Sequence, residues 1–152
     1  MRTVSELIKP QDMIICEGEL LSKMAMIHLE NVGLHNIIFT GDSPVPGAGL
    51  PLSIGVKIAR PESRVFLFTD TRNLKRHHRE FQTASRYHLP VTTFLFQGNK
   101  EKPDEEVDFS ILSESLGVPS RRISDPSESL TASEVESSFD SLKGMLFDMS
   151  SC

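Results

Sequence analysis

An aspartate ends the apolar segment VFLFTDT, which spans residues 65–71. A short apolar run of this kind predicts a strand buried on both faces, so the carboxylate of Asp70 stands where a strand ends. A carboxylate in this position can bind a divalent cation through its oxygen atoms, or it can accept backbone N–H groups of the turn that follows. The residues alone leave both roles open for Asp70.

A second candidate for chemistry is the Gly/Pro-rich segment GDSPVPGAGLP, at residues 41–51. It lies between a predicted strand and a predicted helix, and glycines before a helix start can expose unpaired backbone N–H groups to a phosphate. It is not a Walker loop, because no Gly-Lys-Ser/Thr follows, and it is not the dinucleotide motif G-x-G-x-x-G. A turn that only packs the helix against the strand is the alternative interpretation.

Other ionisable residues fit structural roles. His77 and His78 are adjacent and cannot share one helix face, so we interpret the segment KRHHRE as a solvated basic surface. Glu17 and Glu19 follow the first predicted strand, and we expect them in an exposed acidic loop. A phosphoacceptor role for Asp70, as in receiver domains, would need an acidic pair after the first strand and a lysine after the last. The sequence shows CEGE and no such lysine.

Strand-like and helix-like segments alternate along the chain. Runs rich in β-branched and aromatic residues predict strands at residues 13–16, 36–40, 64–69, 91–96 and 120–124. Apolar residues at helical spacing predict helices at residues 19–33, 50–61, 74–90 and 108–117, and from a capping box at 131–134 on to Leu146. This order predicts an α/β fold, with a doubly wound, mostly parallel sheet of five or six strands and helices on both faces. Ligands of such sheets bind outside the carboxyl ends of the strands, which is where Asp70 stands.

Composition limits the class of protein. The 152 residues fit a single domain over 1–152, and their formal charge of -5 argues against nucleic acid as a partner, because binding to its backbone relies on basic residues. The apolar runs are strand-sized and the N-terminal segment lacks the apolar core of a signal peptide, so we expect no membrane partner. Cys16 and Cys152 form neither a disulfide framework nor a metal-type spacing, which favours a cytoplasmic protein.

Three phrases of the sequence resemble a known family. They are GAGLPLSIGVKIARPESRVFLFTD at residues 47–70, EFQTASRYHLPVTTFLFQGN at 80–99 and DFSILSESLGVPSRRISDP at 108–126. Together they are similar to the diphosphate-binding domain of thiamine diphosphate enzymes of the acetolactate synthase, pyruvate decarboxylase and sulfopyruvate decarboxylase type. The segment EFQTASRYHLPV is the most specific part, and the resemblance covers nearly the whole chain.

The resemblance implies a cofactor site for thiamine diphosphate and magnesium. Asp70 matches the family's magnesium-binding aspartate, and Gln97 and Asn99 stand beside the position of its asparagine ligand, which here is Gly98. By the same resemblance the residues next to the cofactor are Gly47, Ala48, Gly49, Leu50, Thr69 and Thr71. The two threonines replace glycines, and a β-branched side chain at residue 71 would fill space that the family keeps for phosphate.

Two hypotheses follow from these matches and departures. The first is the diphosphate-binding subunit of a split 2-oxo acid decarboxylase or carboligase, a lyase whose partner chain supplies the pyrimidine-binding domain that 152 residues leave no room for. The second is a degenerate homologue without catalytic activity, which acts as a structural or regulatory protein-binding module. In either case the resemblance implies a homo-oligomer or a hetero-oligomer.

Overall fold

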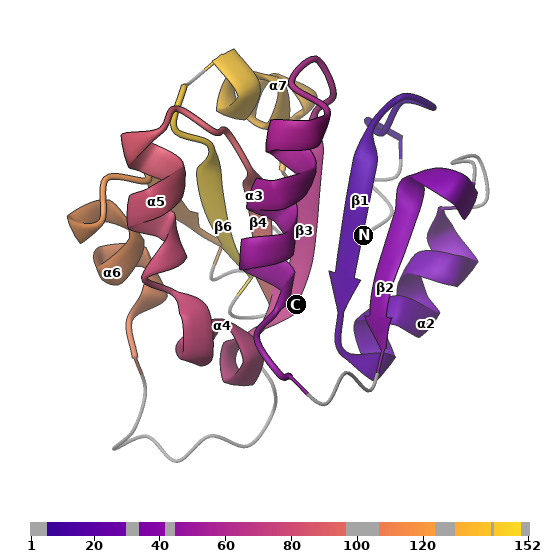
Figure 1. Cartoon of the computed structure of the whole chain (residues 1–152), viewed down its shortest axis with the longest axis horizontal. Coiled ribbons are helices and arrows are strands. Elements are labelled where there is room, and N and C mark those ends of the chain that lie inside the picture. Colours follow the sequence, from indigo (N-terminus) through magenta and orange to yellow (C-terminus); the bar gives the residue numbers. More distant parts are fainter. Residues whose placement is uncertain are drawn as a thin grey trace.

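Six parallel strands form one sheet in the part of the chain that the computed structural model describes, which is residues 6–29, 34–41, 45–96, 107–123, 130–140 and 142–149. The strands lie in the order β2-β1-β3-β4-β6-β5 (Figure 1). Their bounds are β1 Met13–Glu17, β2 Ile37–Gly41, β3 Val65–Asp70, β4 Thr92–Phe96, β5 Ser120–Arg122 and β6 Met145–Met149. The predicted α/β fold with a mostly parallel sheet is therefore confirmed.

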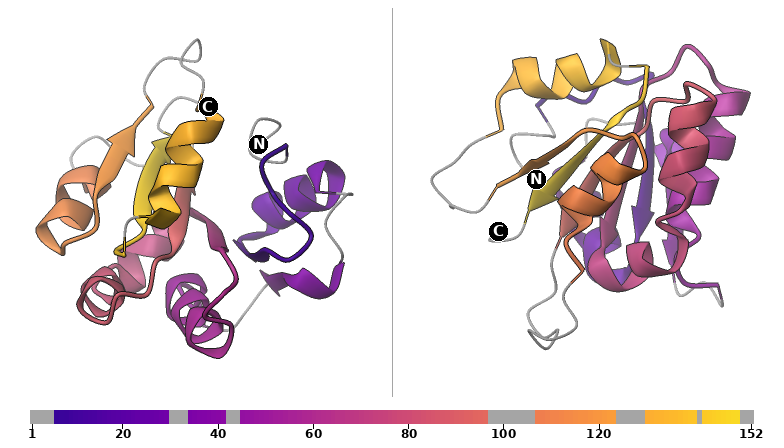
Figure 2. Two further views of the ribbon diagram at one scale, coloured as in Figure 1. Left: turned by 90° about the horizontal axis from the view of Figure 1, so that it is seen from above. Right: turned by 90° about the vertical axis from the view of Figure 1, so that its left-hand side faces the viewer.

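Helices cover both faces of the sheet (Figure 2). One face carries α3 (Gly49–Ala59), α4 (Thr71–His77), α5 (Glu80–Arg86) and α6 (Phe109–Ser115), and the other carries α2 (Glu19–His28) and α7 (Ala132–Asp140). A short 3₁₀ turn, η1 (Leu34–Asn36), leads into β2. The longest of these helices, α3, has 11 residues, so no helix in the described ranges has the length or the apolar character to cross a bilayer.

Two hydrophobic cores form because successive side chains of a strand point to opposite faces. In β3, Val65 and Leu67 pack under α3 and α5, whereas Phe66 and Phe68 belong to the core under α2 and α7. On this second face the rings of Phe68 and Phe94 stack with their centroids 5.1 Å apart. The central strands are thus buried on both sides, as their continuous apolar pattern predicts.

The strand order places a topological switch point at β1. The chain leaves β1 to form β2 on one side and later forms β3 on the other, so the loops after β1 and β3 diverge to opposite faces. In open parallel sheets this divergence opens a crevice outside the carboxyl ends of the two strands. Asp70 is the last residue of β3 and therefore stands at this crevice.

Two predicted elements are wrong in detail. The last helix ends at Asp140, and Leu146, predicted in that helix, lies in the middle of β6, which pairs with β4 and β5. The hydrogen bonds that make residues 145–149 a strand come from distant segments, so the local spacing did not reveal them. The predicted helix at 74–90 is two helices, α4 and α5, which are separated at His78 and Arg79.

Glu17 contradicts the expectation of an exposed acidic loop. Only 4% of its surface is exposed, because the alternation of β1 directs it to the same face as Met13 and Ile15. One carboxylate oxygen accepts the backbone N–H of Gly49 at 3.0 Å, and the other accepts the hydroxyl of Thr69 at 2.8 Å. A single buried side chain thereby joins β1 to β3 and to the first residue of α3.

Replacing Glu17 with Ala is expected to lower the free energy of unfolding by about 2–4 kcal/mol, because two buried donors would lose their acceptor. Glu17→Gln keeps the shape and one acceptor oxygen, so its loss should be less than about half as large. Urea unfolding measures both. The control is Glu19→Ala, whose side chain is 67% exposed and whose loss should stay within about 0.5 kcal/mol. Equal effects of Glu17→Ala and Glu19→Ala would contradict this role.

Cys16 is fully buried in the core under α2, and burial raises the pKa of its thiol to about 12. Because the thiolate is the reactive form, Cys16 should resist a thiol reagent at about pH 8 in the native protein and react after unfolding in urea. The measurement uses a Cys152→Ser variant, so that one thiol remains. Labelling of the native variant as fast as that of the unfolded one would show that Cys16 is accessible.

Candidate functional site

Asp70 caps a helix with one of its carboxylate oxygens and leaves the other oxygen outside that cap. As the N-cap of α4, its Oδ1 atom accepts the backbone N–H of Asn73 at 2.8 Å, which satisfies one of the unpaired donors at the helix start. Its Oδ2 atom faces the turn after β1, where a Cβ built on Gly18 would lie 3.4 Å away. Gly18 has φ of +101°, a conformation that favours glycine, so this turn can pass close to the carboxylate.

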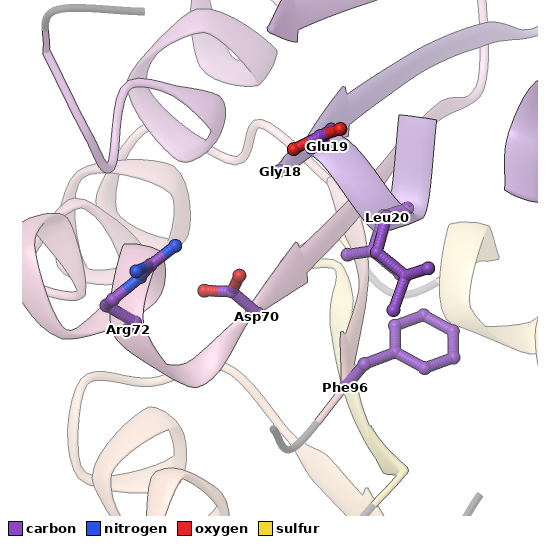
Figure 3. A pocket seen from close by; sticks show the side chains of 7 residues that line it. Gly18, Glu19, Leu20, Asp70, Arg72 and Phe96 are labelled. Carbon is purple, nitrogen blue, oxygen red and sulfur yellow. The ribbon is translucent and has the colours of Figure 1, made fainter. Parts of the chain in front are cut away.

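A cavity of about 320 Å³ opens beside this carboxylate. It lies at the switch point, between the loops that follow β1 and β3, and the end of β4 closes another side. Its lining residues are Gly18, Glu19, Leu20, Leu21, Asp70, Arg72 and Phe96. Asp70 and Arg72 lie on one side of the cavity and Leu20 and Phe96 on the other (Figure 3). The cavity therefore offers charged groups on one wall and apolar groups on the opposite wall.

The threonines beside Asp70 do not line the cavity. Thr69 is fully buried, and its hydroxyl donates to Glu17 on the face covered by α3. Thr71, the first residue of α4, is 8% exposed and is also absent from the cavity lining. Their β-branched side chains are thus not part of the wall of this cavity.

The glycine-rich segment packs against protein. Gly47 has φ of +88°, and a Cβ there would lie 2.7–2.9 Å from atoms of His77, Asn73 and Arg76 in α4. The Gly49 N–H is taken by Glu17, and Leu50 is 1% exposed in the core. None of the residues from Gly47 to Leu50, Ala48 included, lines the cavity. In this conformation the segment serves helix packing, the alternative that the sequence had left open.

The other predicted metal ligands, Gln97 and Asn99, lie outside the described residues. Among the described residues no group of three or more His, Cys, Asp or Glu side chains could hold a metal ion. A magnesium ion that bridges to phosphates needs only one or two carboxylates from the protein, and water completes its shell. The second oxygen of Asp70, facing the cavity, fits this arrangement.

The charges around the cavity are unevenly paired. Glu19 forms an ion pair with Lys23 at 2.5 Å, and the hydrogen bond from Lys23 lowers the pKa of this exposed carboxylate. Arg72, the one cation among the lining residues, is exposed and makes no ion pair with any residue in the described ranges. In the sequence, the only feature that marks Arg72 is its place two residues after Asp70.

Comparisons with known proteins agree with the resemblance in the sequence. The family model of the thiamine pyrophosphate enzyme, C-terminal TPP binding domain, matches residues 22–102, just over half of the chain. A probable acetolactate synthase large subunit from Methanococcus aeolicus is 28% identical, over 61% of this chain and 18% of its own length. A second one, from Methanocaldococcus jannaschii, is 27% identical over 70% of this chain and 21% of its own length. The chain therefore spans about a fifth of these curated relatives.

The fold has solved counterparts as well. The thiamine diphosphate-dependent 4-hydroxybenzoylformate decarboxylase of Rhodococcus jostii RHA1 superposes with a TM-score of 0.76 at 18% identity, over 99% of this chain and 31% of that one. At this identity the likeness shows the fold, and the match of the family model shows the family. The chain belongs to the thiamine pyrophosphate enzymes, as a C-terminal TPP-binding domain.

Proposed function

We propose that this chain provides the diphosphate-binding part of a thiamine diphosphate-dependent enzyme that acts on 2-oxo acids, as a decarboxylase or a carboligase. The observation that carries the proposal is the carboxylate of Asp70, which the cap of α4 holds at a cavity of about 320 Å³ at the switch point of the sheet. When bound, thiamine diphosphate would supply a nucleophilic ylid and a thiazolium ring that stabilises carbanions. The part of this chain is to bind and orient the diphosphate end.

In this proposal Asp70 would hold magnesium with its carboxylate, while Oδ1 keeps its bond to the N–H of Asn73. Gln97 and Asn99, which follow β4, remain the proposed additional ligands. Thr69 and the segment from Gly47 to Leu50 help to position the site, because Glu17 accepts a hydrogen bond from Thr69 and another from Gly49. A second polypeptide or segment supplies the pyrimidine-binding domain, and the assembly is an oligomer in the cytoplasm.

A second candidate is a degenerate domain that keeps the fold and a pairing surface but no longer binds the cofactor. It is favoured by the glycine-rich segment, in which Gly47 is packed against α4 and the N–H of Gly49 is bonded to Glu17. In this conformation neither Gly47 nor the N–H of Gly49 is available to bind a phosphate. Such a protein would act through a partner chain, as a structural or regulatory module.

Calorimetric titration with thiamine diphosphate and magnesium distinguishes the two candidates. Binding at a ligand concentration of about 100 Kd would stabilise the protein by about 2.7 kcal/mol, which is a rise in Tm of roughly 5–10 °C for a chain of this size. Asp70→Asn retains an oxygen for the helix cap but removes the charge, so affinity for the magnesium complex should fall at least about tenfold.

The control for this substitution is Asp140→Asn, at the exposed end of α7. It should change neither the heat of binding nor the shift in Tm. The titration is run on the chain alone and on the chain together with a candidate protein that contains a pyrimidine-binding domain. If neither setting gives a heat of binding or a rise in Tm, the cofactor proposal is overturned and the degenerate module remains.

A further inference from the structure

Arg72 is a charged group of the cavity for which the fold itself has no evident use. Its side chain is exposed, it lines the cavity from the same wall as Asp70, and no described residue forms an ion pair with it (Figure 3). The other lining carboxylate, Glu19, is already paired with Lys23. Among the lining residues, the guanidinium of Arg72 is thus the cationic side chain that is available to an anion.

The donors that a glycine-rich segment usually gives to a phosphate are already used. The N–H of Gly49, at the start of α3, donates to the buried carboxylate of Glu17 at 3.0 Å. That carboxylate fills the space beside Gly49, since a Cβ there would lie 2.6 Å from its Oε2 atom. A phosphate at this helix start would therefore collide with the buried carboxyl group of Glu17, which already occupies that space.

We propose that Arg72 binds the phosphate groups of the ligand directly and replaces the glycine-rich segment as the anion-binding element of the site. This inference deepens the proposed function, and it rests on that function in taking the phosphates to be those of the cofactor. A guanidinium group donates two parallel hydrogen bonds to phosphate oxygens, so one arginine can substitute for several backbone donors.

The placement of the two charges gives the ligand a defined chemistry. Asp70 alone would repel a diphosphate, and a divalent cation on its Oδ2 atom reverses this effect. Arg72 needs no cation and can bind the same anion from the same wall of the cavity. A magnesium-bound diphosphate satisfies both groups, whereas thiamine, a cation without phosphate, offers no anionic group to Arg72.

The test titrates the full chain with inorganic pyrophosphate in the presence of magnesium. Arg72→Ala should weaken binding by about 10- to 100-fold, the usual effect of losing a charge-assisted pair. Arg72→Lys keeps the charge but loses the bidentate geometry, so its affinity should lie between those of Ala and Arg. The control is Arg79→Ala, which removes an exposed arginine of the segment KRHHRE that does not line the cavity. It should bind as the wild type does.

The outcomes separate this inference from the proposed function. Unchanged affinity of Arg72→Ala for pyrophosphate overturns the role of Arg72, even where thiamine diphosphate binds through Asp70. Binding of pyrophosphate that depends on Arg72, without any binding of thiamine diphosphate, supports Arg72 and overturns the cofactor. If the wild-type chain binds neither compound, both proposals are wrong. Circular dichroism at the temperature of the titration confirms that each variant is folded.

Discussion

The buried carboxylate of Glu17 is the contact on which the carboxyl edge of the sheet depends. It brings together the last residue of β1, the hydroxyl of Thr69 in β3 and the first N–H of α3. Removing a carboxylate from water is costly, and the two donors offset that cost only while all three segments keep their places. The interaction therefore acts as a constraint, because the turn after β1, the glycine-rich segment and the end of β3 cannot move independently.

This constraint decides where an anion can bind. The start of α3 is the place where a parallel α/β protein commonly holds a phosphate, and here the carboxyl group of Glu17 accepts the N–H at that point. Gly47 also leaves no room for a phosphate, because its backbone lies so close to α4 that not even a side chain would fit between them. In the part of the chain that the structure describes, a cavity is open at this edge between the loops after β1 and β3, with Asp70 and Arg72 on its wall.

Much of this fold could be predicted from the sequence, because its evidence is local. The strands containing Ile15, Phe66 and Phe94 are short apolar runs between turn residues, and the helix from Gly49 has apolar residues at helical spacing. The strand containing Leu146 escaped prediction, because its hydrogen bonds are made with residues far away in the chain. The role of Glu17 escaped prediction for a similar reason, since the two groups that donate to its carboxylate lie 32 and 52 residues further on. The one indication in the sequence was the alternation of β1, which directs Glu17 to the same face of the sheet as Ile15.

A helix cap alone does not make a binding site, and a second aspartate of this chain shows what distinguishes Asp70. Asp108 caps α6 in the same manner, with its Oδ1 accepting the N–H of Ile111 at 3.0 Å. Its carboxylate also pairs with Arg122 at 2.6 Å, and that hydrogen bond holds the pKa of Asp108 below its usual range. Asp70 has the same cap and a nearby arginine, yet Arg72 stands beside the cavity and is not paired with it. The cap fixes the direction of the Asp70 carboxylate, and the open space between the two charges is what leaves room for a ligand.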